Sequence, residues 1–332
     1  MISIVNRAQF DPIASKRMLT LLIAVMATLC LTAQQKITKM NIWMGNEVSF
    51  QANIDKIDSI TFDEIYVTTE GALKGEFSVS ANKKVHFSKG NLRYYAPTNS
   101  WAFADQQYSI IGYPNINISS TYDGWIDLFG WGTSGWNSGA IAYQPYSSSV
   151  DDADYQIGGG TMNDMTGAYA NADWGVYNAI ANGGNKPGLW RTLTYTEWKY
   201  LISLRTNASK LRAKATVGSQ PGYILLPDDW VLPEGLAFSL TPSDWDYNRN
   251  VYSLEQWETM EEAGAVFLPC TGMRHGTIEV GSWSSGYYWS ATPESETKAW
   301  NVGFYYDYMG ISTSSLRHCG FGVRLVQDIE DY

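Results

Sequence analysis

Charge, histidine and cysteine are all scarce in this sequence of 332 residues. Charged side chains make up 17% of it and the formal net charge is −10, so it offers no basic stripe that could hold a nucleic-acid backbone. The three histidines, His86, His275 and His318, are too far apart in the chain to form a histidine-rich iron motif. His275 and His318 could meet in space, but a pair alone does not make a site.

Familiar catalytic motifs are also missing. The chain has no G-x-S-x-G nucleophile elbow, no P-loop and no G-x-G-x-x-G that opens a helix. Residues 158–160 are three glycines, but polar residues follow them instead of Lys-Thr, which is typical of a flexible loop. We therefore expect a protein that is not an enzyme and that carries no cofactor.

Aromatic residues are abundant instead. They make up 14% of the chain, with 14 Trp, 22 Tyr and 11 Phe. A chain with so much apolar surface can offset the entropy lost on folding, so it is not disordered. Its length suits one large domain or two modest ones.

Residues 19–31 form an uncharged apolar run that directly follows Lys16-Arg17, as in a secretory signal. The run is shorter than the about 20 residues that a membrane-spanning helix needs. We expect cleavage after Ala33, so that residues 1–33 are a signal peptide. The protein would then be secreted or held at the cell surface, with no membrane span left after cleavage.

Two cysteines remain after the signal is removed, Cys270 and Cys319. In an exported chain they either form one disulfide or stay as two buried thiols that act as small hydrophobic side chains. The sequence leaves both alternatives open.

The rest of the chain divides by composition. Residues 34–66 predict a small β module that is too short to bury a core of its own. Residues 67–75 are small and polar, as expected for a linker. The main domain follows at 76–327, and residues 328–332 are an acidic tail that we expect to be frayed.

The main domain begins with a pair of strands and a long irregular region. Apolar and polar residues alternate over 76–95, which predicts two strands joined near Asn82. Residues 101–139 show no helix or strand period. We expect an ordered loop there, held by its aromatic side chains, namely Trp125, Phe129, Trp131 and Trp136.

Two helices and four strands follow. Thr194 with Glu197, and Ser253 with Gln256, have the spacing of capping boxes that open helices. Strands are expected at 265–268, 287–291, 300–306 and 321–326. Helices followed by an antiparallel sheet indicate an α+β fold class.

Several segments of the sequence resemble those of a known protein family. They are LWRTLTYTEWKYL (189–201), GAVFLPCTGMR (264–274), GYYWSAT (286–292), AWNVGF (299–304) and GFGVRLV (320–326), preceded by FSVSANKKVHFSKGNLRY (77–94), DLFGWGTSG (127–135) and the module at 43–62. In this order they resemble exported proteins of Bacteroidetes-type bacteria with a C-type-lectin-like fold, related to the formylglycine-generating-enzyme and Fibrobacter major paralogous domains. The resemblance implies long loops rich in Trp and Gly, and it implies four core tryptophans: Trp190, Trp198, Trp289 and Trp300.

The metal site of such lectins is incomplete in this sequence. Lectins of this fold pair E-P-N or Q-P-D with W-N-D, whereas Trp300-Asn301 is followed here by Val302. A second candidate for calcium has the ligand spacing of an EF-hand loop, with Asp244, Asp246, Asn248, Asn250 and Glu255. Arg249 stands where that loop needs glycine. A polar loop leading into a helix is the alternative that we favour, so no metal is expected, with calcium as the remaining possibility.

The C-terminal strands supply the candidate binding site. If the strand at 300–306 alternates, Trp300, Val302 and Phe304 point into the core and the other face meets solvent. Tyrosines beside Asp, Asn and Arg suit both sugar stacking and protein recognition. The candidates are Tyr287, Asn301, Tyr305, Tyr306, Asp307, Tyr308, Arg317 and His318.

Three functions compete. The favoured one is an exported module that binds a glycan or a surface protein. In a sharper form, the resemblance extends to proteins whose C-terminal surface is diversified by retroelements. The alternative is a structural or adhesive subunit of a cell-surface or pilus assembly, docked through its N-terminal module. A formylglycine-generating type of enzyme is the least favoured, because it uses a close cysteine pair that this chain lacks.

Overall fold

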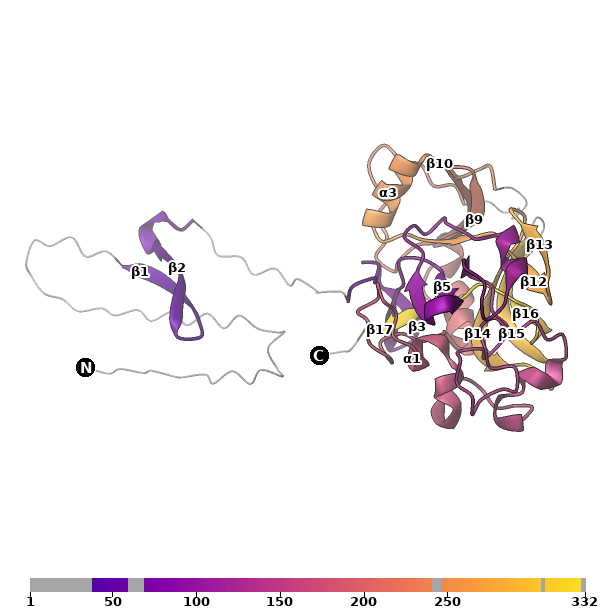
Figure 1. The fold of residues 1–332 in the computed structure, drawn as a ribbon. Coiled ribbons are helices and arrows are strands. Elements are labelled where there is room, and N and C mark those ends of the chain that lie inside the picture. The colour runs from indigo at the N-terminus through magenta and orange to yellow at the C-terminus, as the bar shows by residue number, and fades with distance from the viewer. Residues whose placement is uncertain (1–37, 59–68, 241–246, 306–307, 330–332) are drawn as a thin grey trace, which may run out of the picture. The chain divides into compact units, whose positions relative to one another are not determined.

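The computed structural model describes residues 38–58, 69–240, 247–305 and 308–329 (Figure 1). The chain divides into two compact units, Met1–Tyr66 and Val67–Tyr332. The expected signal peptide, residues 1–33, lies outside the described residues. Within the described ranges, no helix combines the length and the apolar character needed to cross a membrane.

The described part of the first unit, residues 38–58, forms a β-hairpin. Strands β1 (Lys39–Met44) and β2 (Glu47–Asn53) pair antiparallel and are followed by a short 3-10 helix, Ile54–Lys56. Gly45 makes the turn between the strands with a φ of 65°, which glycine adopts at no steric cost. Trp43 and Phe50 are half exposed or more. A two-stranded hairpin is marginally stable alone, so this unit has little core of its own.

The second unit has the α+β architecture expected from the sequence, with helices and four sheets of mixed and antiparallel strands. Two of these sheets are small. One has the order β17-β4-β3, formed by Val326–Asp328, Lys83–Phe87 and Phe77–Ser80. The other has the order β6-β5-β7, formed by Ser100–Phe103, Leu92–Tyr95 and Trp125–Ile126. The two strands predicted within 76–95 are therefore confirmed, with β3 and β4 antiparallel.

The two larger sheets come from the second half of the chain (Figure 1). One has the order β10-β8-β9-β11, formed by Val251–Tyr252, Arg212–Val217, Gln220–Leu225 and Val266–Pro269. The other has the order β13-β12-β14-β15-β16, formed by Ile278–Ser282, Thr271–His275, Gly286–Pro293, Lys298–Tyr305 and Tyr308–Leu316. Most neighbours are antiparallel, whereas β10 with β8 and β12 with β14 pair parallel.

Both predicted capping boxes are formed. Thr194 caps α2 (Tyr195–Lys199) and Ser253 caps α3 (Leu254–Glu262), each with its partner side chain returning to the cap backbone. A π-helical turn, Tyr200–Leu204, continues α2, and α1 spans Trp174–Tyr177. In Figure 1, α3 lies beside β9 and β10. Further 3-10 helices are Ala96–Thr98, Tyr113–Asn117, Asp152–Tyr155, Ile157–Gly159, Gly167–Ala172 and Ala208–Lys210.

Tryptophans hold the long irregular region between β6 and α2. Trp131 Nε1 donates to the carbonyl of Ser290 at 2.9 Å, and Trp289 Nε1 donates to that of Phe129 at 2.7 Å. These two bonds cross between the loop and β14 in opposite directions. Trp174 and Trp190 donate to loop carbonyls in the same way. Buried indole N–H groups thus satisfy loop carbonyls that no strand pairs with, and the expectation of an ordered, aromatic-held loop is confirmed.

Two expected segment boundaries differ in the structure. Residues 69–75, part of the expected linker, pack on the second unit: Leu73 is buried, and its N–H donates to the carbonyl of Phe87 at 2.8 Å. The expected tail also begins as a strand residue, because Asp328 in β17 pairs with Arg191. Burial of Leu73 holds residues 69–75 in place, and the ion pair with Arg191 holds Asp328. The composition of these segments alone predicts a linker and a frayed tail. Residues 330–332 lie outside the described ranges.

The last predicted strand, 321–326, is also shorter than expected. Phe321 and Gly322 make isolated bridges with Phe129 and Tyr288, and only Val326 belongs to a strand, β17. The apolar side chains of this segment are all buried. These side chains lie between sheets. The alternation of apolar residues over 321–326 therefore reflects packing in the core and not hydrogen bonding to neighbouring strands.

Candidate functional site

The predicted binding residues do not share one exposed surface. Tyr305 at the end of β15 is 36% exposed. Tyr287 on β14 is half-buried and stacks on Phe321, with ring centroids 4.9 Å apart. Tyr306 and Asp307 lie outside the described residues, and Tyr308 opens β16, where only its backbone is described. Among the candidates with a described side chain, Tyr305 is exposed and Tyr287 is partly so.

Asn301, Arg317 and His318 were expected to meet solvent, and this expectation is wrong. All three are at most 3% exposed. Arg317 lies 4.7 Å over the ring of Trp131 and donates to the carbonyls of Ser295 and Thr161. Burial lowers the pKa of this guanidinium to about 10. Backbone carbonyls from distant loops and an aromatic face replace water around the charge, which is why the segment can turn inward.

The expected alternation along β15 fails at its first residue. Val302 and Phe304 are buried in the core as predicted, but Trp300 is half-buried and stacks on Tyr195 at 4.3 Å. The pairing of β15 with β16 shifts register between Asn301 and Gly303. Such an irregularity breaks the two-residue period, so Trp300 leaves the core face and Asn301 is buried instead.

The two cysteines remain free thiols. Cys270 belongs to the hydrophobic cluster around β3, β4 and β9, and Cys319 to the cluster around the tryptophan loops. Burial raises the pKa of Cys270 to about 12 and that of Cys319 to about 11. Of the two alternatives left open by the sequence, the structure has the buried thiols. The alternative of a disulfide between Cys270 and Cys319 is not formed.

The EF-hand-like spacing is not assembled in the described part of the chain. Asp244 and Asp246 lie outside it. Asn250 is buried and holds the backbone of Lys214 and Ser239, while Glu255 is exposed in the first turn of α3. Across the described residues, no three His, Cys, Asp or Glu side chains group as a metal cage.

A different surface has the composition expected of a binding site. It is the outer face of the sheet β6-β5-β7, where Ser100, Tyr95 and Trp125 form one row of cross-strand neighbours. The alternate residues of these strands, Tyr94 and Ile126 among them, are buried in the core. Alternation on a half-buried sheet thus places Tyr95 and Trp125 outward. We call Arg93, Tyr95, Asp123 and Trp125 the aromatic platform.

The platform combines two rings with charged groups. The rings of Tyr95 and Trp125 lie 5.4 Å apart at an angle of 37°, and Trp125 is 37% exposed. The Tyr95 hydroxyl donates to the Asp123 carboxylate, and this hydrogen bond raises the pKa of Tyr95. Arg93 is half-buried on the same face of β5. The hydrogen bond fixes the phenol ring, so the platform is ordered before any ligand arrives.

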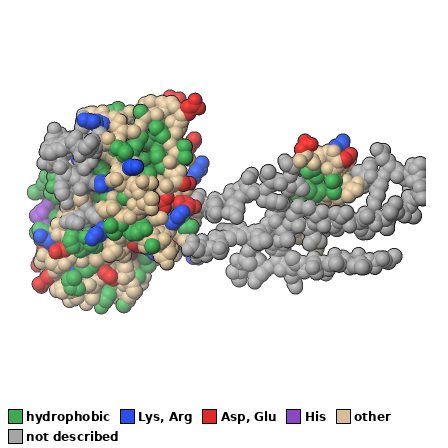
Figure 2. Space-filling view, turned by 180° about the vertical axis from the view of Figure 1, so that it is seen from behind, with side chains coloured by type: hydrophobic (Ala, Val, Ile, Leu, Met, Phe, Trp, Pro, Cys, Tyr) green, Lys and Arg blue, Asp and Glu red, His purple; other side chains and the backbone are tan. Residues whose placement is uncertain are grey.

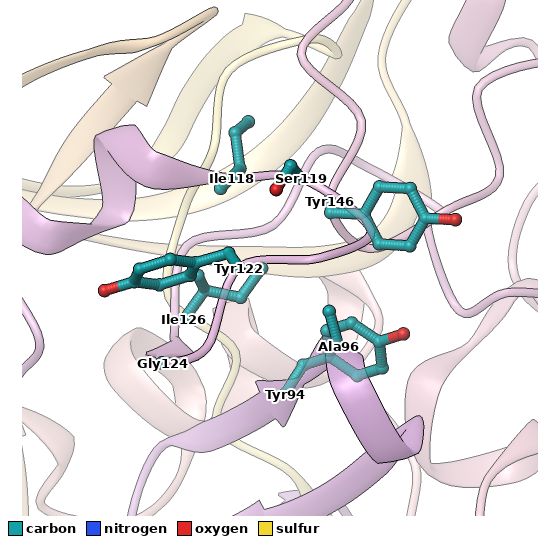
Figure 3. A pocket seen from close by; sticks show the side chains of 8 residues that line it. All are labelled: Tyr94, Ala96, Ile118, Ser119, Tyr122, Gly124, Ile126 and Tyr146. Carbon is teal, nitrogen blue, oxygen red and sulfur yellow. The ribbon is translucent and has the colours of Figure 1, made fainter.

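A shallow hollow adjoins the platform through the segment 122–126 (Figure 3). Its walls are mostly aromatic and aliphatic, and it is too shallow to enclose a water molecule; its lining residues are Tyr94, Ala96, Ile118, Ser119, Tyr122, Gly124, Ile126 and Tyr146. In Figure 3 the hydroxyls of Tyr122 and Tyr146 point away from the hollow on opposite sides. A Cβ atom at Gly124 would lie 2.4 Å from the Tyr122 ring, so a larger residue there would displace this ring.

Comparison with known protein families gives a match for one segment of the chain. Residues 249–326 match the family model of a domain of unknown function, DUF8237. The match contains β14 to β16 and both cysteines, whereas the aromatic platform lies outside it. No curated protein and no solved structure matches the chain.

The aromatic platform is not among the sites expected from the sequence, although the alternation of residues in two of its strands points to it. Trp125 was expected to hold the loop from inside, but it is one of its exposed residues. The short runs LRYY (92–95) and SWAF (100–103) alternate, which would have placed Tyr95 outward. The pairing of Trp125 with Tyr95 has no sequence signal, because β7 is only two residues long.

Charge on the surface is mixed. On the face of the larger unit drawn in Figure 2, acidic and basic side chains are interspersed with apolar ones and form no stripe of one sign. A surface of this kind does not concentrate a polyanion.

Proposed function

We propose that this chain is an exported carbohydrate-binding module with a C-type-lectin-like fold. The observation that carries the proposal is the pairing of Tyr95 with Trp125 beside the Asp123 carboxylate. The C–H face of a pyranose ring is apolar and packs on aromatic rings, while carboxylate and guanidinium groups bind its hydroxyls. Asp123 supplies the carboxylate beside the rings, and Arg93 supplies a guanidinium from the same face of β5.

Two further features support the proposal. Export is supported by the apolar run at 19–31 after Lys16-Arg17. The fold assignment is supported by the long loops whose carbonyls are bound by buried indoles, such as those of Trp131 and Trp289. The expectations that no cofactor takes part in holding the saccharide and that no reaction is catalysed remain part of the proposal.

The experiment is a glycan array with the purified chain, followed by titration of the best saccharide. Trp125→Ala should weaken binding by about fivefold or more, since one stacked ring contributes about 1 kcal/mol or more to binding. The melting temperature should change little, because Trp125 is exposed. Trp283→Ala is the matched control: it removes an exposed tryptophan, 56% accessible, from the turn that follows β13.

Tyr305→Ala decides between the two surfaces. If Tyr305→Ala abolishes saccharide binding and Trp125→Ala does not, the C-terminal segment is the site and the platform assignment is wrong. If no saccharide binds but a surface protein is retained in a pull-down that Trp125→Ala abolishes, the platform recognises protein and the carbohydrate proposal fails.

A second candidate function is a structural or adhesive subunit of a surface assembly. It is favoured by the hairpin β1–β2, whose Trp43 is 58% exposed and whose Phe50 is 50% exposed. Deleting residues 34–58 should then abolish incorporation into the assembly and leave saccharide binding by the second unit unchanged. Retained incorporation would contradict this role.

A further inference from the structure

Two of the three histidines lie against each other in the second unit, one exposed and one buried. His275 ends β12, and His318 follows β16. Their rings are nearly perpendicular, at 87°, with centroids 4.6 Å apart. Asp152, which begins the 3-10 helix Asp152–Tyr155, lies against His318. Three segments far apart in the sequence thus bring two imidazoles and one carboxylate together.

Asp152 determines which nitrogen of His318 carries the proton. Its Oδ1 atom lies 2.9 Å from His318 Nδ1 and 3.2 Å from the His318 backbone nitrogen. An ionised carboxylate only accepts hydrogen bonds, so Nδ1 donates. In the neutral ring, Nε2 therefore carries the lone pair.

Nothing in the described part of the chain binds this lone pair. Nε2 of His318 is a buried atom without a hydrogen-bond partner there, and the side chain is 4% exposed. An unsatisfied buried polar atom costs about 1–3 kcal/mol. By contrast, the His275 side chain is exposed at the end of its strand, where its ring contacts that of His318.

This arrangement is that of a metal-binding histidine. A ligating imidazole commonly donates its other N–H to a carboxylate, which fixes the tautomer and orients the ring. Metal–nitrogen distances of about 2.0–2.1 Å would place two ring centres roughly 4.5–5.3 Å apart for binding at right or tetrahedral angles. The observed 4.6 Å lies within that range.

We propose that His275 and His318 bind one divalent transition-metal ion, with Asp152 as the positioning residue. Imidazole ligands suit Zn²⁺, Ni²⁺ and Cu²⁺ better than Ca²⁺. Two protein ligands leave the remaining positions to water or to a donor atom of a bound molecule. Buried Arg274 and Arg317 lie nearby and oppose a further positive charge, while Asp152 offsets it. The site is therefore of modest affinity.

The test uses the chain purified without a histidine tag, treated with EDTA and dialysed. Zn²⁺ and Ni²⁺ are titrated by calorimetry. We expect one equivalent to bind to the wild type, and His275→Ala to weaken binding at least tenfold. His275 is exposed, so this variant should fold. His86→Gln is the matched control, because His86 is buried and its Nδ1 contacts the Gly75 carbonyl; it should bind like the wild type.

Asp152→Asn separates positioning from ligation. It should keep the one-to-one stoichiometry and weaken affinity by about 10–100-fold, as loss of an orienting carboxylate does. The proposal is overturned if the wild type binds neither ion, or if His275→Ala binds as tightly as the wild type. Equal weakening by His86→Gln would also overturn it, because binding would then reflect histidine content and not this pair.

Discussion

Arg191 and Glu197 form a two-pronged ion pair, with Nη1 to Oε2 and Nη2 to Oε1 both at 2.8 Å. Glu197 is also the residue that completes the capping box of α2. Arg191 in turn reaches Asp328 of β17 at 2.6 Å. One carboxylate thus stabilises the start of a helix and, through one arginine, the last strand of the chain.

Glu197→Gln should lower the free energy of unfolding by about 2 kcal/mol, because glutamine keeps the cap but loses the charge-assisted pair. Urea unfolding measures the loss. Gln256→Glu is the control: it exchanges the same two residue types in the capping box of α3, where no ion pair is involved, and should change stability little. An equal loss in both variants would contradict the role of the ion pair.

The same pair predicts a dependence on acid. Burial raises the pKa of Glu197, but the hydrogen bond and charge of Arg191 outweigh it and lower the pKa overall. A lowered pKa contributes stability above the unfolded value near 4.5, and this contribution is lost as the pH falls through the folded pKa. The difference between wild type and Glu197→Gln should therefore shrink below pH 4.5. A constant difference would contradict the assignment.

Ionisation of Asp173 should lower the stability of the fold, whereas ionisation of Glu197 raises it. Its carboxylate is buried and accepts N–H groups of Gly175 and Thr192 at 3.0 and 2.7 Å. Burial nevertheless raises its pKa from 3.8 to about 6. The unfolded chain ionises first as the pH rises, so the free energy of unfolding falls by about 2 kcal/mol between pH 4 and pH 6. Asp173→Asn should lack this fall in urea unfolding at the two pH values.

Both cysteines should resist alkylation in the folded protein. Their thiols are buried, and with pKa values of about 12 and 11 they stay protonated at neutral pH. Iodoacetamide should modify Cys270 and Cys319 only after unfolding in guanidinium, without any reductant. Peptide mass mapping checks this, and a linked pair of peptides would contradict it.

Replacing Trp289 or Trp300 in the C-terminal strands by alanine should lower the free energy of unfolding by different amounts. Trp289 is 1% exposed, packs on Phe321 at 4.3 Å and donates to a loop carbonyl, so Trp289→Ala should cost about 3–5 kcal/mol. Trp300 is half-buried on Tyr195, and Trp300→Ala should cost about 1–2 kcal/mol. Equal losses in urea unfolding would place Trp300 in the core after all.

Local patterns determined the elements that depend on near neighbours. Thr194 and Glu197 are three residues apart, so the sequence alone predicts the capping box and the start of α2. The alternation around Phe77 and Val85 likewise predicts β3 and β4. Large aromatic side chains such as Trp190 and Trp198 are buried wherever a core exists. These features follow from propensity and from the amount of apolar surface, which the sequence contains.

Tertiary structure decided the rest, because it depends on contacts between distant segments. The register shift after Asn301 reverses the faces of β15, and it arises in the pairing with β16. Arg317 is buried because carbonyls of Thr161 and Ser295 replace its water. The two cysteines stay apart because they pack in separate clusters. Folding also makes neighbours of Tyr95 and Trp125, and of His275 and His318. These pairs are far apart in the sequence, so no local spacing predicts them.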